Sequence, residues 1–359
     1  MTAADKAFLF QLLDTPSPSG FESAGQRIWA GYLRRHADRV ESDHYGNVWA
    51  TLDGSAKDNA PRLMLEAHAD EIGLMVNHIS DDGFLFITRI GGSDRAIARG
   101  RSVRILGSQG EVEGILGNTA IHLRDRTDDK LPEWHDLFID IGAGNKDAVA
   151  ARGIRVGHPA VLAESARPFG DTRIVGRALD NRIGGFIIAR VMAQLAASGN
   201  RPAATVHAVN AVQEEVGGHG ARMMSYRLNP TVAVVLDVCH ATDSPGISAP
   251  KHGLTKLGGG PGLMHGASTH PLVVQRLMEV AEKEGIPLQH EASTGFSGTD
   301  TDQIFDTRAG IPSALVSLPM RYMHSTVEMV DTADLDAVVR LLTAFVHALT
   351  PADAFKISI

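Results

Sequence analysis

The segment Thr205–Ala221, with the sequence TVHAVNAVQEEVGGHGA, constrains the fold more than any other part of the chain. Its first half consists of small and β-branched residues, which is typical of a buried strand. The apolar run then ends at two adjacent acids, Glu214 and Glu215, and a glycine pair. Two carboxylates at the end of a buried strand are costly unless a cation lies beside them. The segment therefore predicts a strand whose end binds something positively charged.

Other apolar runs in the chain also end in residues that can bind a metal. The predicted strands 62–67, 174–179, 231–236 and 312–318 are followed, in that order, by His68, Asp180, Asp237 and His324. Ligands of open α/β sheets bind beyond the carboxyl ends of the strands, so we expect these side chains to gather there. With one of the two glutamates they make two imidazoles and three carboxylates. Such a set suits a pair of divalent ions such as Zn²⁺, Co²⁺ or Mn²⁺.

Asp70 and the glutamate pair have predicted supporting functions. Residues i and i+2 of an extended segment point the same way, so Asp70 is placed to accept from the ring N–H of His68 that faces away from a metal. Glu214 and Glu215 point in different directions, so one is a ligand and the other a general base for a metal-activated water. Their spacing leaves open which is which. Taken singly, Asp180 also fits a helix N-cap.

The sequence pattern changes twice along the chain. Helix and strand patterns alternate up to about residue 71 and again after about residue 168, where the apolar-periodic helix 181–195 follows. Between them lie short β-type runs separated by glycines, with almost no helical period. We therefore expect one discontinuous α/β domain, formed by residues 1–71 and 168–359. Residues 72–167 would be inserted into it as a β-rich domain.

Composition restricts the possible partners and the compartment. The formal net charge of −8, with the acids spread out, argues against a general nucleic-acid or membrane binder. The first 20 residues lack the features of a secretory signal, and no run approaches the ~20 apolar residues of a membrane span. Cys239 is the single cysteine, so neither an intrachain disulfide nor a thiolate cluster is possible. These features predict a cytoplasmic protein.

Seven short segments, spread over nearly the whole chain, carry a resemblance to a known family. They are SPSGFE (17–22), EAHADEIG (66–73), ALDNRIGG (178–185), QEEVGGHGA (213–221), LDVCHATDSPG (236–246), SGTDTD (297–302) and RYMHSTVE (321–328). In this order they resemble the M42 metallo-aminopeptidases, which include the tetrahedral (TET) and glutamyl aminopeptidases. Gly218, His219 and Cys239 differ from the residues frequent in that family, and none of the three is a candidate ligand.

The resemblance implies a specific arrangement of two metal ions. His68 and Asp237 would bind one ion, and Glu215 and His324 would bind the other. Asp180 would bridge the two.

The resemblance also implies the remaining functions and the fold. Glu214 would be the general base and Asp70 would orient His68. The α/β domain would be a zinc-peptidase-like catalytic domain, with a mixed sheet sandwiched by helices. The inserted domain would be PDZ-like and mediate dimerisation. Family members often form dodecameric tetrahedra with the active sites facing an inner cavity, which limits the substrates to short peptides.

Hydrolysis of the N-terminal bond of short peptides is the expected reaction, and three alternatives stay open. A deacylase or carboxypeptidase would use the same centre. A glycosidase of the endoglucanase type needs two acids and no metal, which leaves His68 and His324 without a function. A non-catalytic assembly protein would not need Glu214. The sequence leaves the preferred N-terminal residue undecided, because Lys251 and Lys256 fit either a pocket for acidic side chains or solvated loop positions.

Overall fold

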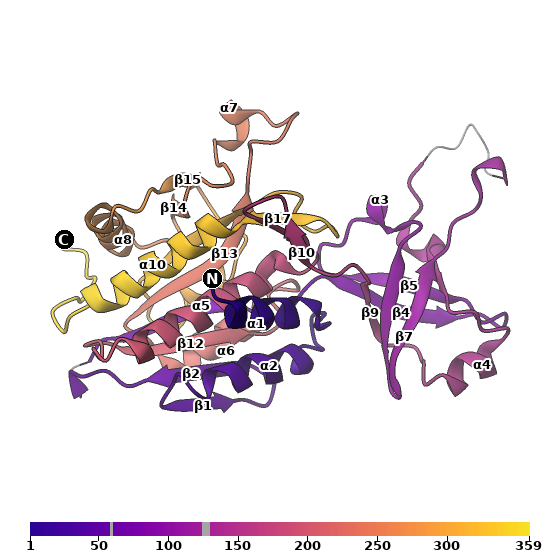
Figure 1. Ribbon diagram of the computed structural model, residues 1–359, viewed down its shortest axis with the longest axis horizontal. Coiled ribbons are helices and arrows are strands. Elements are labelled where there is room, and N and C mark those ends of the chain that lie inside the picture. The colour runs from indigo at the N-terminus through magenta and orange to yellow at the C-terminus, as the bar shows by residue number, and fades with distance from the viewer. Residues whose placement is uncertain (58–59, 124–129) are drawn as a thin grey trace.

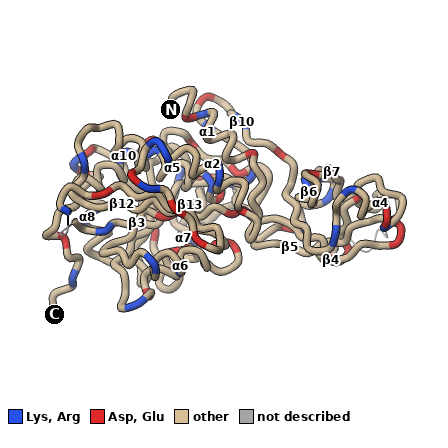
Figure 2. The backbone as a smooth tube through the Cα atoms, turned by 90° about the horizontal axis from the view of Figure 1, so that it is seen from below, with Lys and Arg blue, Asp and Glu red and all other residues tan. Residues whose placement is uncertain are grey.

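A computed structural model shows that the chain folds into two units of unequal size. The structure describes residues 1–57, 60–123 and 130–359. A larger α/β unit carries both ends of the chain, and a smaller β-rich unit stands to one side of it (Figure 1). Acidic and basic residues are interspersed along both units (Figure 2). Within the described residues, no helix combines the length and the apolarity that a membrane crossing requires.

The larger unit is built around an eight-stranded mixed sheet with the strand order β1–β2–β12–β3–β13–β16–β14–β15. The strands are β1 (Arg39–Ser42), β2 (Val48–Leu52), β3 (Arg62–His68), β12 (Thr205–Ala211), β13 (Val232–His240), β14 (Gly262–Gly266), β15 (Gln289–Ser293) and β16 (Ser313–Met320). The four central strands, β12, β3, β13 and β16, run parallel to one another. Their carboxyl ends therefore meet at one edge of the sheet, where ligands of such sheets bind.

Helices cover both faces of this sheet, as the alternation of its side chains requires. Leu63 and Leu65 of β3 belong to the core under one layer of helices, whereas Met64 belongs to the core on the opposite face. The first layer contains α1 (Ala3–Asp14), α2 (Ser23–Leu33), α5 (Leu179–Ala197), α8 (Pro271–Glu284) and α10 (Thr332–Ala348). The second layer contains α6 (His219–Leu228) and α9 (Thr301–Ile304). The larger unit is thus a three-layer α/β sandwich.

The smaller unit is a closed barrel with its own apolar core, in the strand order β4–β5–β8–β7–β6–β9. Its strands are β4 (Gly73–Ile79), β5 (Leu85–Ile90), β6 (Ser102–Gly107), β7 (Gly110–Leu116), β8 (Phe138–Asp140) and β9 (Pro159–Leu162). The short helices α3 (Arg95–Ala98), η2 (Ile121–Leu123), η3 (Trp134–Asp136) and α4 (Lys146–Ala151) connect them. Helices of three to six residues are too short to show a helical period, so the sequence did not indicate them.

One predicted strand lies outside the main sheet. The run 174–179 was expected to end at the same edge as the other ligand-bearing strands, and this expectation is wrong. Its strand, β11 (Arg173–Gly176), pairs instead with β10 (Arg167–Phe169) and β17 (Glu328–Asp331) in a separate three-stranded sheet. The partner strands have three and four residues, which leaves too little sequence for a recognisable pattern.

A buried ion-pair network lies where the chain passes between the two units. Glu71, just before β4, pairs with Arg177, and Arg182 lies 3.7 Å from the same carboxylate. Arg104 of the barrel donates to the backbone oxygen of Asp14 at 2.6 Å, and Arg177 donates to the same atom at 3.1 Å. Glu71, Arg177 and Arg182 are buried together within the larger unit, and breaking their pairing would cost several kcal/mol. The bond from Arg104 of the barrel to Asp14 is the contact of this network that crosses between the two units.

Candidate metal centre

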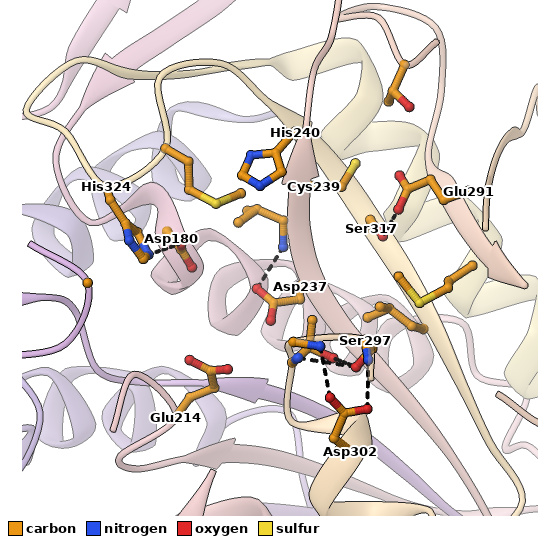
Figure 3. A pocket seen from close by; sticks show the side chains of 18 of the residues that line it. Asp180, Glu214, Asp237, Cys239, His240, Glu291, Ser297, Asp302, Ser317 and His324 are labelled. Atoms are coloured by element: carbon orange, nitrogen blue, oxygen red, sulfur yellow. Dashed lines mark hydrogen bonds and ion pairs between the residues drawn. The ribbon is translucent and has the colours of Figure 1, made fainter. Parts of the chain in front are cut away.

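The predicted ligands gather at the carboxyl edge of the main sheet, next to a cavity (Figure 3). His68 is the last residue of β3, and Asp237 lies near the end of β13. The others lie in segments that follow β11, β12 and β16: they are Asp180, Glu214, Glu215 and His324. Asp180 reaches the site from the first turn of α5, although its strand belongs to the separate small sheet.

The ligand atoms form two groups that share one carboxylate. His68, Asp180 and Asp237 make the first group, and Asp180, Glu215 and His324 make the second, with the atoms of each group within 4.8 Å of one another. Nε2 of His68 lies 3.2 Å from Oδ1 of Asp180. Nε2 of His324 lies 3.2 Å from Oδ2 of the same residue. Each oxygen of Asp180 thus faces a different imidazole, which is the geometry of a carboxylate between two cation positions.

Asp70 connects the first group to the turn that carries both glutamates. Nδ1 of His68 lies 3.3 Å from the Asp70 carboxylate and 3.2 Å from its backbone oxygen. The same carboxylate accepts the backbone N–H groups of Glu214 at 3.0 Å and Glu215 at 3.2 Å. The hydroxyl of Ser19 donates to it at 2.6 Å. One buried side chain therefore sets the orientation of His68 and of the glutamate turn together.

Glu328 supports the other side of the centre, and reasoning from the sequence missed it. Its carboxylate accepts the backbone N–H of Asp180 at 3.1 Å and that of His324 at 3.0 Å. Burial, together with the nearby charge of Asp180, raises its pKa well above the usual value. The residue closes the motif at 321–328, but an acid in a sequence motif carries no sign that it binds the backbone N–H of Asp180, 148 positions away.

Three residues in the turns of the site adopt the left-handed backbone conformation. Ala178, Gln213 and His324 have φ angles of 59°, 64° and 59°. Residues other than glycine adopt this region at a cost of about 1–3 kcal/mol, and they concentrate where a site imposes the backbone path. Ala178 lies two residues before Asp180, Gln213 directly precedes Glu214, and His324 is itself a predicted ligand. The rest of the fold therefore holds these residues in an unfavourable backbone conformation, which brings their side chains or those of their neighbours to the site.

Several carboxylates are buried together in the site, and their negative charges are stable there only if positive charge lies nearby. Burial raises the pKa of Asp237 well above its usual value and that of Glu214 to about 9. Hydrogen bonds to Asp180 and Glu215 raise the pKa of His324 to about 11. For His68, burial lowers the pKa, but the surrounding carboxylates raise it well above its usual value overall. Without another cation, the site takes up protons; two divalent ions would neutralise the same carboxylates.

The donor set also fits divalent metal ions in its chemistry. Imidazole nitrogens and carboxylate oxygens are the usual ligands of Zn²⁺, Co²⁺ and Mn²⁺. Oε1 of Glu215 is buried and has no hydrogen-bond partner among the described residues. A buried acceptor without a donor needs a partner, and a metal ion held by the neighbouring ligand atoms would provide one. The residues present therefore fit a pair of ions.

The barrel unit supplies one wall of this centre. Gly91 and Gly92 follow β5, and a Cβ added to Gly92 would lie 2.5 Å from Nδ1 of His324. A Cβ on Gly91, whose φ is 64°, would lie 3.1 Å from Cβ of Glu215. The two glycines thus allow the barrel to pack directly against the second ligand group.

The centre opens into a cavity of about 990 Å³. Two loop segments, 244–268 and 293–302, supply part of its lining. From the segment 244–268 the lining residues are Lys251, His252, Gly253, Thr255 and Met264, and from 293–302 they are Ser297, Gly298, Thr299 and Asp302. Asp302 holds its loop in shape by accepting the backbone N–H groups of Ser297 and Gly298 (Figure 3). Lys256 is not among the lining residues.

Comparison with known proteins identifies the family. The family model described as M42 glutamyl aminopeptidase matches residues 46–341. The chain belongs to the M42 family. It is 34% identical to the lysyl aminopeptidase of Pyrococcus furiosus over 97% of this chain and 99% of that protein. This M42 protein is therefore an aminopeptidase, a hydrolase that acts on peptide bonds, as the resemblance predicted.

Solved structures of aminopeptidases share the whole fold. Aminopeptidase APDkam598 from the archaeon Desulfurococcus kamchatkensis is 33% identical, with 99% of each chain covered and a TM-score of 0.91. The TET1 peptidase of Pyrococcus horikoshii is 28% identical, with 96% of this chain and 100% of that chain covered and a TM-score of 0.85. It is described as assembling into a tetrahedron or a large octahedral shell, and another structure of TET1 is a dodecamer.

The close packing of Gly92 against His324 leads to a prediction about metal binding in this aminopeptidase. In Gly92→Ala the new methyl group would displace the rigid imidazole of His324, so we expect at least one metal ion to bind about tenfold or more weakly. Titration calorimetry of Zn²⁺ or Co²⁺ into chelator-treated protein measures this. Gly144→Ala is the matched control in the same unit, because nothing lies within 4 Å of its added Cβ. Equal affinity in the two variants would contradict the packing argument.

Proposed function

We propose that the protein is a dinuclear-metal aminopeptidase that removes the N-terminal residue from short peptides. The observation that carries this proposal is the pair of ligand groups joined through Asp180. His68 and Asp237 would hold one ion, Glu215 and His324 the other, and Asp180 both. When bound, these ions supply Lewis-acid polarisation of the scissile carbonyl and of the attacking water.

Glu214 is proposed as the general base, because it lies at the site but belongs to neither ligand group. Its Oε2 lies 3.8 Å from Nε2 of His68, and its side chain points into the space beside Asp237 (Figure 3). Burial raises its pKa to about 9, and two adjacent divalent cations would lower that value and favour the carboxylate.

The proton balance of the proposed reaction runs through this one side chain. The Glu214 carboxylate accepts a proton from water as the water oxygen attacks the scissile carbonyl carbon. The C–N bond then breaks, and Glu214 returns the proton to the departing amine. Asp70 does not exchange a proton in this scheme; it holds the glutamate turn through the two backbone N–H groups.

The acids of the centre also favour a substrate with a free amino group. Carboxylates beside the metal positions would pair with a protonated N-terminus, whereas a deacylase or carboxypeptidase on the same centre would not require one. The preferred side chain does not follow from the relatives, because the matching family is described as glutamyl and the P. furiosus protein as lysyl.

Self-association is proposed to proceed through the inserted barrel, a PDZ-like dimerisation module, and to give a dodecamer. The barrel stands to one side of the larger unit, so most of the barrel is not packed against that unit (Figure 1). The same overall fold assembles into a tetrahedron in the TET1 peptidase. An inner cavity of such an assembly would admit short peptides and exclude folded proteins.

Activity on a substrate panel tests the proposed reaction. We expect aminoacyl-anilides and short peptides with a free amine to be hydrolysed, N-acetylated ones not to be, and a chelator to abolish turnover. Adding back Zn²⁺, Co²⁺ or Mn²⁺ should restore it. Turnover of the blocked substrates would identify a deacylase or endopeptidase instead, and turnover that survives complete metal removal would exclude the metal mechanism.

Replacement of the proposed base tests its function separately. In Glu214→Gln the amide cannot accept the proton from water, so kcat should fall by about 10² to 10⁴. Metal content, measured by mass spectrometry of the bound elements, should stay unchanged because Glu214 is not a ligand. Glu279→Gln, an exposed change on α8, is the control. Normal turnover in the Glu214 variant would assign the proton transfer to another group.

The mass of the protein in solution tests the assembly. We expect a species of about twelve times the 38.3 kDa chain, measured by light scattering after size-exclusion chromatography. A monomer or an isolated dimer at micromolar concentration would contradict the dodecamer.

A further inference from the structure

A partly buried acid that the mechanism does not use lines the same cavity. Glu291 lies on β15, at the edge of the main sheet, and its side chain is seen beside Ser317 in Figure 3. The strand register places it on the same face as the metal centre. Asp237 pairs with Ser317, Ser317 pairs with Gly262, and Met264 on the Gly262 strand pairs with Glu291.

A missing side chain lets Glu291 reach back toward the metal centre. A Cβ on Gly262 would lie 2.3 Å from Oε1 of Glu291, so the carboxyl group lies over the space that a larger residue there would fill. Its Oε2 lies 3.4 Å from Oγ of Ser317. Because Ser317 is the direct partner of Asp237, the carboxyl group is offset from the strand of Asp237 by roughly one to two strand spacings, about 5–10 Å.

The carboxyl group of Glu291 is poorly satisfied by the protein. Oε1 is buried and has no hydrogen-bond partner within the described part of the chain. The thiol of Cys239 lies beside it (Figure 3), and burial followed by the charge of Glu291 raises the pKa of that thiol. An acceptor left without a donor at the wall of a cavity gains most from a ligand that brings a charged N–H group.

We propose that Glu291 selects peptides whose N-terminal residue has a basic side chain, lysine or arginine. The proposal rests on the aminopeptidase function above, which places the N-terminal residue beside Asp180 and Asp237. The long aliphatic stem of a basic side chain would pass Leu315 and Met264, which line the same cavity. Its terminal N–H groups would then meet the Glu291 carboxylate.

Positive groups at the same cavity would favour the opposite selectivity. Lys251 and His252 belong to the short helix α7 (Ala249–His252), which projects away from the sheet (Figure 1). Both side chains are exposed, so solvent and salt screen their charge. His290 also lines the cavity, but it shares a hydrogen bond of 2.8 Å with His265. Glu291 lies against the sheet, where solvent and salt screen a charge less than at the exposed rim.

Glu291→Gln tests the proposal with a side chain of the same size. The metal-loaded wild type should cleave lysyl- and arginyl-anilides with a higher kcat/KM than leucyl- and glutamyl-anilides. In the variant, the ratio of lysyl to leucyl kcat/KM should fall at least about tenfold, as expected for losing a hydrogen bond to a charged group. The leucyl value and the metal content should stay within about twofold. An unchanged ratio would overturn the proposal.

Two further variants separate the possible explanations. Gly262→Ala keeps the charge but pushes the carboxyl group off the strand, so it should also lower the lysyl-to-leucyl ratio. Lys251→Gln should leave that ratio unchanged; a change there and none in Glu291→Gln would assign selectivity to the rim and overturn the proposal. Good leucyl activity without a basic preference would overturn the selectivity alone. No turnover of any free-amine substrate by metal-loaded wild type would overturn the aminopeptidase function as well.

Discussion

The rest of the structure depends on how one edge of the sheet accommodates buried carboxylates. Asp180, Asp237 and Glu215 approach one another at the ends of elements that carry almost no exposed surface there. Burial and the nearby charge of Asp180 raise the pKa of Asp237 and of Glu215. For Asp180, burial raises the pKa, but hydrogen bonds from His324 and His68 lower it below its usual value overall. The donor set of this arrangement fits divalent cations, and hydrogen bonds to the surrounding backbone hold the carboxylates in place.

The supporting structure comes from parts of the chain that are far apart in sequence. The parallel central strands bring His68 and Asp237 together, while Asp70 and Glu328 hold neighbouring turns through backbone N–H groups. The barrel contributes Gly91 and Gly92 to the wall of the second ligand group. The inserted unit is therefore part of the site as well as a candidate surface for assembly, and Arg104 of the barrel bonds to the backbone oxygen of Asp14 at the junction.

The selectivity proposal follows from the same sheet. β14 and β15 extend the face on which Asp237 lies, so a side chain two or three strands away still borders the substrate cavity. The glycine at 262 decides how far Glu291 reaches across that face. The proposed metal ligands lie at the centre of the sheet, and Glu291 lies on its edge strand. Residues at the edge could therefore change to suit another substrate without altering the metal ligands.

Several elements were predictable because their signals are local. Apolar strands ending in His68, Asp237 or the glutamate pair indicate a ligand site directly, since a buried charge needs a partner. The β-rich character of residues 72–167 followed from short runs and glycines, and strands with a closed barrel occur within that range. Glu328 and Glu291 were not assigned any function, because the contacts of Glu328 with Asp180 and of Glu291 with Ser317 form only when separate segments come together.

By itself, the sequence determined which residue types stand at the ends of buried strands, and hence that a cation site and an M42 aminopeptidase were to be expected. Only the tertiary structure decided that the strand before Asp180 belongs to a separate sheet, that the two Asp180 oxygens face different imidazoles, and that Gly92 and Glu291 border the site. The physical reason is that strand propensity and burial act over a few neighbouring residues, whereas ligand geometry depends on register and packing between segments that are distant in the sequence.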